Sequence, residues 1–222
     1  MEGNKGNTAP NTGGPTPPPA TSIVKVDMKL PVIMAIVAAV LVLLSVFMLP
    51  WYHLDDENTW DGETEEQTLD YTLDKIKFKS GDEEDEIEYD DTLVSDDLMD
   101  ILDTTRILGI VTGVVILLGF VFALLLHLGN STKLFAMLMV VMLILGAVMS
   151  IVTPLYFMVK WTDMMNEDVD EERGFFDSYE DDDGDKTSQR PGTSWFMFWV
   201  SAALCLVAFI FGRKGLIEAS LM

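Results

Sequence analysis

The sequence predicts an α-helical membrane protein, a four-transmembrane helix bundle that carries a small extracellular antiparallel β-sheet. Three observations lead to this fold class. Four long segments contain no charged residue, 33 of the 36 acidic residues lie in two loops between these segments, and one acidic stretch alternates apolar with polar residues. A formal net charge of −22 beside 49% hydrophobic residues requires that charge and hydrophobicity lie in different parts of the 222-residue chain.

Four apolar segments are long enough to cross a bilayer, whose hydrocarbon core of about 30 Å needs roughly 20 helical residues. We expect transmembrane helices at 30–50, 107–128, 134–159 and 195–212. Lipid offers no water to satisfy free backbone groups, so a spanning segment has to be helical or part of a closed barrel, and the alternating pattern of a barrel is missing. The lipid bilayer is therefore the first partner that the sequence predicts.

The segments between the spans form two chemically different sets. The loop 51–106 holds 21 acidic and 4 basic residues, and the loop 160–194 holds 12 acidic and 4 basic residues. The other set consists of a Pro- and Gly-rich tail, 1–29, which we expect to be disordered, the turn 129–133 and the tail 213–222. One side of the membrane is thus predicted to be strongly acidic.

Basic residues close to the spans predict the orientation of the chain. Arg106 and Lys160 flank spans on the acidic side. More cations flank spans on the other side, namely Lys25, Lys29, Lys133, Arg213 and Lys214. The positive-inside rule then predicts a multi-pass protein of the cell membrane with both termini in the cytoplasm and two acidic extracellular loops. Trp51, Trp161 and Trp195 are expected to form one interfacial belt on the extracellular side.

The first acidic loop has the alternation of a strand pattern. Apolar side chains recur at every second position in three runs, which are Leu69-Tyr71-Leu73, Ile76-Phe78 and Ile87-Tyr89. Ser80-Gly81-Asp82 supplies a turn, so we expect an antiparallel sheet with one apolar face. Phe175 and Phe176 of the second loop could dock on this sheet, and helical spacing from Leu98 to Leu108 predicts that span two continues beyond the bilayer.

The sequence offers no catalytic, cofactor-binding or metal-binding residue set. A nucleophile elbow, an HExxH motif, a phosphate loop and a GxGxxG motif are all missing, so we expect a protein that is not an enzyme and has no cofactor. His53 lies among acids, and packing with Trp51 and Tyr52 is favoured over an acid/base pair. The single cysteine, Cys205, excludes an internal disulfide and a cysteine zinc cluster.

The acidic runs at 82–86 and 181–185 invite a calcium interpretation, because Ca²⁺ prefers oxygen ligands. Gly184 in the turn position of an EF-hand would place Tyr179 first and Arg190 last, which are not ligands, so we expect only weak screening by divalent cations. The same charge excludes nucleic acid as a partner, since the field repels phosphate.

Small residues at a spacing of four occur in three spans, as Gly109-xxx-Gly113, Gly146-xxx-Ser150 and Ala35-xxx-Ala39. Such pairs let helix backbones approach closely. We interpret them first as contacts within one bundle, while a membrane-protein partner or self-association remains the other partner class that the sequence predicts.

The layout resembles the claudin and peripheral myelin protein group of four-span proteins over roughly residues 30–212. The residues that carry the resemblance stand at span ends: Leu49-Pro50-Trp51, Leu102 to Arg106, Pro154 with Trp161, and Gly192-Thr193-Ser194-Trp195. The resemblance implies the family's bundle and outer sheet, with a role in lateral contact. It does not imply junction sealing, because Gly-Leu-Trp and the two loop cysteines of the family are not present.

Two functions follow as expectations. The first is a non-enzymatic membrane protein with a structural, adhesion or auxiliary-subunit role, which acts through helix faces and acidic outer loops. The alternative is a cation channel or transporter component, in which an acidic outer vestibule concentrates cations.

Overall fold

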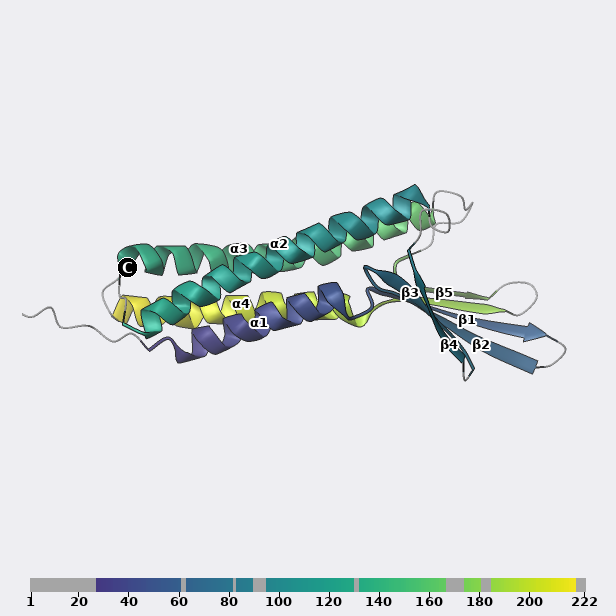
Figure 1. Ribbon diagram of the computed structural model, residues 1–222, viewed down its shortest axis with the longest axis horizontal. Helices are drawn as coiled ribbons and strands as arrows, with labels where there is room; N and C mark the ends of the chain where they lie inside the picture. Colours follow the sequence, from purple (N-terminus) through teal and green to yellow (C-terminus); the bar gives the residue numbers. More distant parts are fainter. Residues whose placement is uncertain are drawn as a thin grey trace, which may run out of the picture.

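The structure is a computed structural model that describes residues 27–60, 63–81, 83–89, 95–129, 132–166, 174–180 and 185–218. The predicted disorder of most of the tail 1–29 lies outside these residues, as do parts of both acidic runs. Four helices lie side by side, and an antiparallel sheet stands at one end of them (Figure 1). Both the start of the first helix and the end of the last lie at the other end, which we call the tail end.

The helices are α1 (Lys29–Phe47), α2 (Asp96–His127), α3 (Lys133–Met165) and α4 (Thr193–Glu218). Each is long and apolar enough to cross a membrane, so the chain has the layout of a four-span membrane protein in contact with the lipid bilayer. With 32 and 33 residues, α2 and α3 are about 50 Å long, well beyond a hydrocarbon core of about 30 Å. They extend past α1 and α4 on the side of the sheet (Figure 1).

Local sequence explains where the helices begin. The hydroxyl of Ser95 accepts a hydrogen bond from the backbone N–H of Leu98 at 3.3 Å, and Asp96 and Asp97 follow in the first turn of α2. Thr132 caps α3 in the same way through the N–H of Phe135. Span two therefore continues as a helix beyond the predicted apolar segment, as the spacing from Leu98 indicated.

The sheet has six strands in the order β4-β3-β2-β1-β6-β5, and all neighbours are antiparallel. Their bounds are β1 Tyr52–Trp60, β2 Glu63–Tyr71, β3 Lys75–Ser80, β4 Glu83–Glu88, β5 Asp177–Glu180 and β6 Lys186–Pro191. Four strands come from the chain between α1 and α2, and two come from the chain between α3 and α4. The described part of the structure is thus a claudin-like layout of four apolar helices with an outer antiparallel sheet.

The sheet is larger than the small one predicted. Alternation located β2, β3 and β4, and Gly81 turns the chain between β3 and β4 with a φ of +57°. The strands β1, β5 and β6 were not predicted. The central strand β1 has Asp55, Asp56 and Glu57 in a row, so acids lie on both faces and the period of two is lost.

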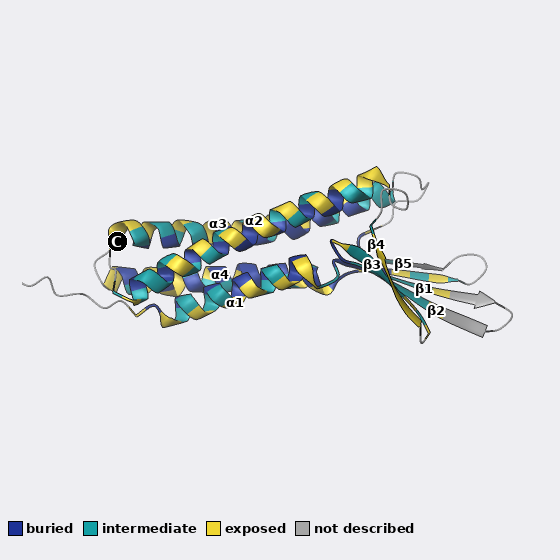
Figure 2. Ribbon diagram, in the orientation of Figure 1, coloured by how far each residue is buried: buried dark blue, intermediate teal, exposed yellow. Residues whose placement is uncertain are grey.

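The bundle core is packed tightly around the small residues. A methyl group on Gly109 would lie 2.5 Å from Cγ2 of Val46 on α1, and one on Gly146 would lie 2.7 Å from Cγ1 of Ile116 on α2. Ala39 and Ser150 are also fully buried. The preferred interpretation of the small-residue motifs is confirmed, because these faces meet other helices of the same chain. Dark blue residues line the helix faces that meet one another (Figure 2).

Aromatic rings join the bundle to the sheet. Trp51 is fully buried between Phe157 and Phe198, with ring centroids 5.2 and 5.1 Å away. Trp161 is 2% exposed, and its ring centroid lies 4.4 Å from that of Tyr52. The predicted interfacial belt is therefore wrong for Trp51 and Trp161, which pack inside the protein. Apolar rings near a span end suit a protein core as well as the headgroup region. Here Trp51 packs against rings of α3 and α4, and Tyr52 and Tyr71 of the sheet pack against Trp161.

Candidate functional site

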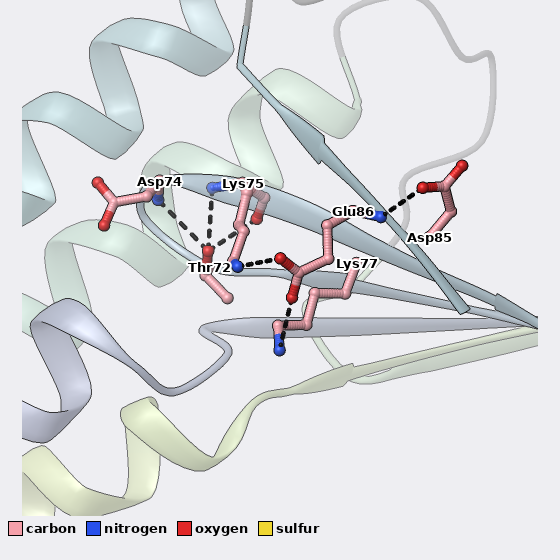
Figure 3. Close-up of polar contacts among 6 residues, drawn as sticks. All are labelled: Thr72, Asp74, Lys75, Lys77, Asp85 and Glu86. Atoms are coloured by element: carbon pink, nitrogen blue, oxygen red, sulfur yellow. Dashed lines mark hydrogen bonds and ion pairs between the residues drawn. The ribbon is translucent and has the colours of Figure 1, made fainter.

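One hydroxyl organises the turn between β2 and β3. Thr72 Oγ1 accepts hydrogen bonds from the backbone N–H groups of Asp74 at 3.3 Å and Lys75 at 3.0 Å, and it donates one to the carbonyl oxygen of Lys75 at 2.7 Å (Figure 3). The hydroxyl of Tyr89 donates to the Thr72 carbonyl oxygen at 2.8 Å. These bonds fix how Asp74 and Lys75 leave the turn. A Thr that bonds its own turn is a common local motif.

The two turn residues then contact different elements. Asp74 Oδ1 lies 2.7 Å from Nη1 of Arg106, which ties the turn to α2. Lys75 Nζ contacts Oε2 of Glu86 on β4 (Figure 3). Arg106 of α2 thus has a partner in the turn between β2 and β3. The turn links the bundle to the outermost pair of strands.

One face of the sheet, which we call the charged face, consists of polar side chains. Because side chains alternate along each strand and the register places them opposite one another, this face contains a cross-strand row of Glu86, Lys77, Asp70, His53 and Arg190. Neighbouring positions of the row carry opposite charges at several points. Cross-strand pairs of this kind stabilise a sheet without any apolar core on that face.

Ion pairs are formed at both ends of this row. Glu86 lies between two cations, contacting Lys75 and placing Oε1 3.1 Å from Nζ of Lys77. Hydrogen bonds from Lys75 and then Lys77 hold the pKa of the Glu86 carboxyl below its usual range. At the other end, Nη2 of Arg190 lies 3.0 Å from Oδ2 of Asp55.

The opposite face, which we call the mixed face, packs against the bundle at its near end. Tyr52 is fully buried, and its hydroxyl donates to Oε1 of Gln189 on β6 at 2.9 Å. Burial raises the pKa of Tyr52, and also that of Tyr71 and Tyr89, because the charged phenolate is disfavoured there. Phe175 docks against Tyr52, with ring centroids 5.2 Å apart, as the sequence suggested, whereas Phe176 is 60% exposed.

The edge strand β4 is the most exposed described element of the sheet. All six of its residues are exposed, and five of them are acidic. Asp85 accepts a hydrogen bond from the N–H of Glu86. Among the residues that the structure describes, Glu83, Glu84 and Glu88 form no ion pair, although Lys79 lies opposite Glu84, and Lys75, which contacts Glu86, lies opposite Glu88. Ile87 adds an apolar side chain that is 44% exposed.

A groove of about 460 Å³ lies where α2 and α3 extend beyond the shorter helices. Its lining combines three carboxylates with one cation, one tyrosine and two apolar side chains: Asp97, Asp100, Ile101, Tyr156, Lys160, Asp163 and Met164. Nζ of Lys160 lies 3.7 Å from Oδ2 of Asp163, so one carboxylate is partly neutralised. The groove and the sheet together form the acidic end of the molecule.

The structure also places the residues that the sequence raised for chemistry. Nδ1 of His53 contacts Oδ1 of Asp70 on the neighbouring strand, so its partner is a carboxylate instead of Trp51 and Tyr52, with which it was predicted to pack. Within the described ranges, no group of three or more His, Cys, Asp or Glu residues could hold a metal ion. The second acidic run, at 181–185, is described only at Asp185.

Sequence reasoning missed the residues that lock the sheet in place. Gln189 and Thr72 are polar, yet they are 4% and 5% exposed. Gln189 lies in no alternating apolar run, and Thr72 takes a polar position in the run Leu69-Tyr71-Leu73, so periodicity marks neither residue as buried. For Thr72 a signal did exist, because Thr and Asp two residues apart, where one alternating run ends and the next begins, are typical of a turn.

A scan against protein-family models and a search of curated proteins found no match to the chain.

Proposed function

We propose that this is a non-enzymatic, multi-pass membrane protein that acts by contact, and that β4 is the surface that meets a cationic partner. In this account the sheet is extracellular and both termini are cytoplasmic. The observation that carries the proposal is the state of the β4 carboxylates. Glu83, Glu84 and Glu88 are exposed, and among the described residues they form no ion pair, although Lys79 and Lys75 of β3 lie opposite Glu84 and Glu88.

The support of β4 favours a contact role. The strand is held in register by β3 along its whole length, and the Thr72 turn anchors β3. Its carboxylates are therefore presented at the fixed spacing of a strand instead of on a mobile chain. Preorganised charge lowers the entropic cost of binding and favours fast association. A partner with Lys or Arg at alternate positions would match this spacing.

The helix faces offer less support for contact in the membrane. The three small-residue motifs that could draw another helix close are already covered by helices of the same chain, at Gly109 and Gly146 most tightly. We therefore place the main contact surface on the sheet. Helix faces that meet the lipid carry larger apolar side chains such as Ile107, which is 61% exposed.

The test is the binding of a lysine-rich peptide to the full chain in lipid nanodiscs. The β4 variant E83Q/E84Q/D85N/E88Q should bind roughly tenfold more weakly, because exposed ion pairs contribute about 0.2 to 1 kcal/mol each. The control variant D97N/D100N/D103N/D163N removes the same formal charge from α2 and α3. Equal weakening in both variants would mean that net charge, and not β4, drives binding.

The alternative is a cation channel or transporter component, and the acidic groove at the outer ends of α2 and α3 favours it. Three carboxylates there would attract cations. Against conduction through one bundle, the described interior is filled by buried apolar side chains such as Ile116, Leu143 and Ala147. Cation flux into proteoliposomes that falls in the D97N/D100N/D103N/D163N variant would favour the channel over the contact role.

A further inference from the structure

The outward face of the last three turns of α4 combines apolar and cationic side chains. Ile210, Arg213, Lys214 and Ile217 recur at the helical spacing of three, one and three residues, so they share one face. All four are exposed. The other face of the helix is buried, since Leu216 is fully buried and a methyl group on Gly212 would lie 2.8 Å from Cε of Met139. The cations therefore point away from the bundle.

A groove of about 350 Å³ lies on this face at the tail end. Its lining is Phe209, Ile210, Arg213, Lys214, Ile217 and Glu218. Among the described residues neither Arg213 nor Lys214 forms an ion pair. Two cations and one carboxylate give this groove a net positive charge. A neighbouring groove has no net charge, because its lining contains two cations and two carboxylates, Asp27, Lys29, Lys214 and Glu218.

We propose that this groove binds an anionic phospholipid, with the phosphate at Arg213 and Lys214 and an acyl chain along Phe209 and Ile210. The apolar half of the groove lies on a helix long and apolar enough to span the membrane, so hydrocarbon is its natural neighbour. A guanidinium binds phosphate through two parallel N–H groups, and Lys and Arg residues next to a membrane span attract anionic headgroups. One ligand then satisfies both halves of the groove.

Two negative charges near the groove oppose the binding of an anion. The carboxyl end of α4 carries a partial negative charge, and Glu218 adds a full one. Arg213 and Lys214 together are needed to outweigh both. Removing the pair should therefore abolish the preference for an anionic headgroup, whereas Arg213→Lys should retain much of it because the charge is kept.

The test compares two lipids with identical acyl chains, phosphatidylglycerol and phosphatidylcholine, on the full chain in detergent. Native mass spectrometry should show retention of phosphatidylglycerol, and the lipid should raise the melting temperature. The variant R213Q/K214Q should lower the ratio of anionic to zwitterionic lipid retained by roughly tenfold. The control is Lys133→Gln, which removes one tail-end cation that lies outside the groove lining, so half of the charge that R213Q/K214Q removes.

Three results would overturn the proposal of a phospholipid site. An unchanged lipid ratio in R213Q/K214Q, or an equal fall in Lys133→Gln, would overturn it. Inorganic phosphate should leave the melting temperature unchanged, because it cannot fill the apolar half of the groove. Stabilisation by phosphate alone would show a site for free anions and would also overturn it. If R213Q/K214Q fails to fold, the single variants Arg213→Gln and Lys214→Gln decide, because each should lower the lipid ratio, and an unchanged ratio in both would overturn the proposal.

Discussion

The indole Nε1 of Trp51 donates a hydrogen bond to the carbonyl oxygen of Ser45, 2.9 Å away, and both residues are fully buried. The same carbonyl oxygen also accepts from the hydroxyl of Ser194 at the start of α4. Ser45 lies in the last turn of α1, and its carbonyl oxygen has no backbone N–H partner within the helix because α1 ends at Phe47. The bond therefore ties Trp51, the residue just before β1, to the end of α1. It thereby fixes the sheet to the bundle.

Trp51→Phe should lower the stability of the protein by about 1 kcal/mol or more, since it removes a buried hydrogen bond together with part of the ring packing. Trp199→Phe is the matched control, because the Nε1 of Trp199 is buried without a partner among the described residues. That change should be close to neutral. Thermal unfolding in detergent measures both. A Trp199→Phe effect as large as that of Trp51→Phe would count against the role of the bond.

Alanine substitutions of the glycines in the bundle should rank by the space that each offers. Gly109→Ala places a methyl group 2.5 Å from Val46, whereas Gly113→Ala places it 3.3 Å from Cδ2 of Leu43. Overpacking costs about 1 to 3 kcal/mol, while helix propensity returns up to about 1 kcal/mol. We expect a clear loss of stability for Gly109→Ala and a small change for Gly113→Ala. The reverse order in melting temperature would contradict the packing of α1 on α2.

The junction of sheet and bundle should weaken in alkaline solution. Burial raises the pKa of Tyr52 above its usual value of 10, so its contribution to stability is complete below pH 10 and is lost as the pH rises through the raised value. Tyr52→Phe should cost about 1 kcal/mol at neutral pH, because Gln189 loses its donor. The cost should shrink above pH 10. A constant difference between wild type and variant across this range would show that Tyr52 does not titrate with unfolding.

The pair between Arg106 and Asp74 should contribute modestly and should depend on salt. Both side chains are about 40% exposed, and exposed pairs contribute about 0.2 to 1 kcal/mol. Asp74→Asn keeps the shape of the side chain and should lower the melting temperature slightly at low salt. At about 1 M salt, where charges are screened within about 3 Å, the difference should vanish. A difference that persists there would point to the turn itself instead of the charge.

The long helices and half of the sheet could be predicted because their signals are local. Charge-free runs predicted the helices, and alternation such as Ile76-Phe78 predicted β3. The strand β1 carries acids on both faces and is held by partners on either side. One of these partners is distant in sequence, since Leu54 lies opposite Gln189. Such pairing leaves no periodic trace in the sequence of the strand.

The acidic charge of the candidate site could be predicted from the sequence, whereas its ion pairs and buried rings could not. The excess of acids on the outer loops predicted an acidic end, and the β4 carboxylates form part of it. Which acids are neutralised depends on side-chain contacts that the sequence does not show, because the register places a lysine opposite each of Glu84, Glu86 and Glu88, yet only Glu86 forms ion pairs among the described residues. The buried state of Trp51 also depends on tertiary contacts, since hydropathy treats a ring facing lipid and a ring facing protein alike.

The most direct test of the contact role is a photo-crosslink from β4. Ile87→p-benzoylphenylalanine places a reactive group at an exposed position among the β4 carboxylates, and Asp103→p-benzoylphenylalanine places one at an exposed position near the start of α2. With a lysine-rich peptide and the full chain in nanodiscs, we expect strong crosslinking from position 87 that is lost in E83Q/E84Q/D85N/E88Q. Equal or stronger crosslinking from position 103, unaffected by that variant, would contradict it.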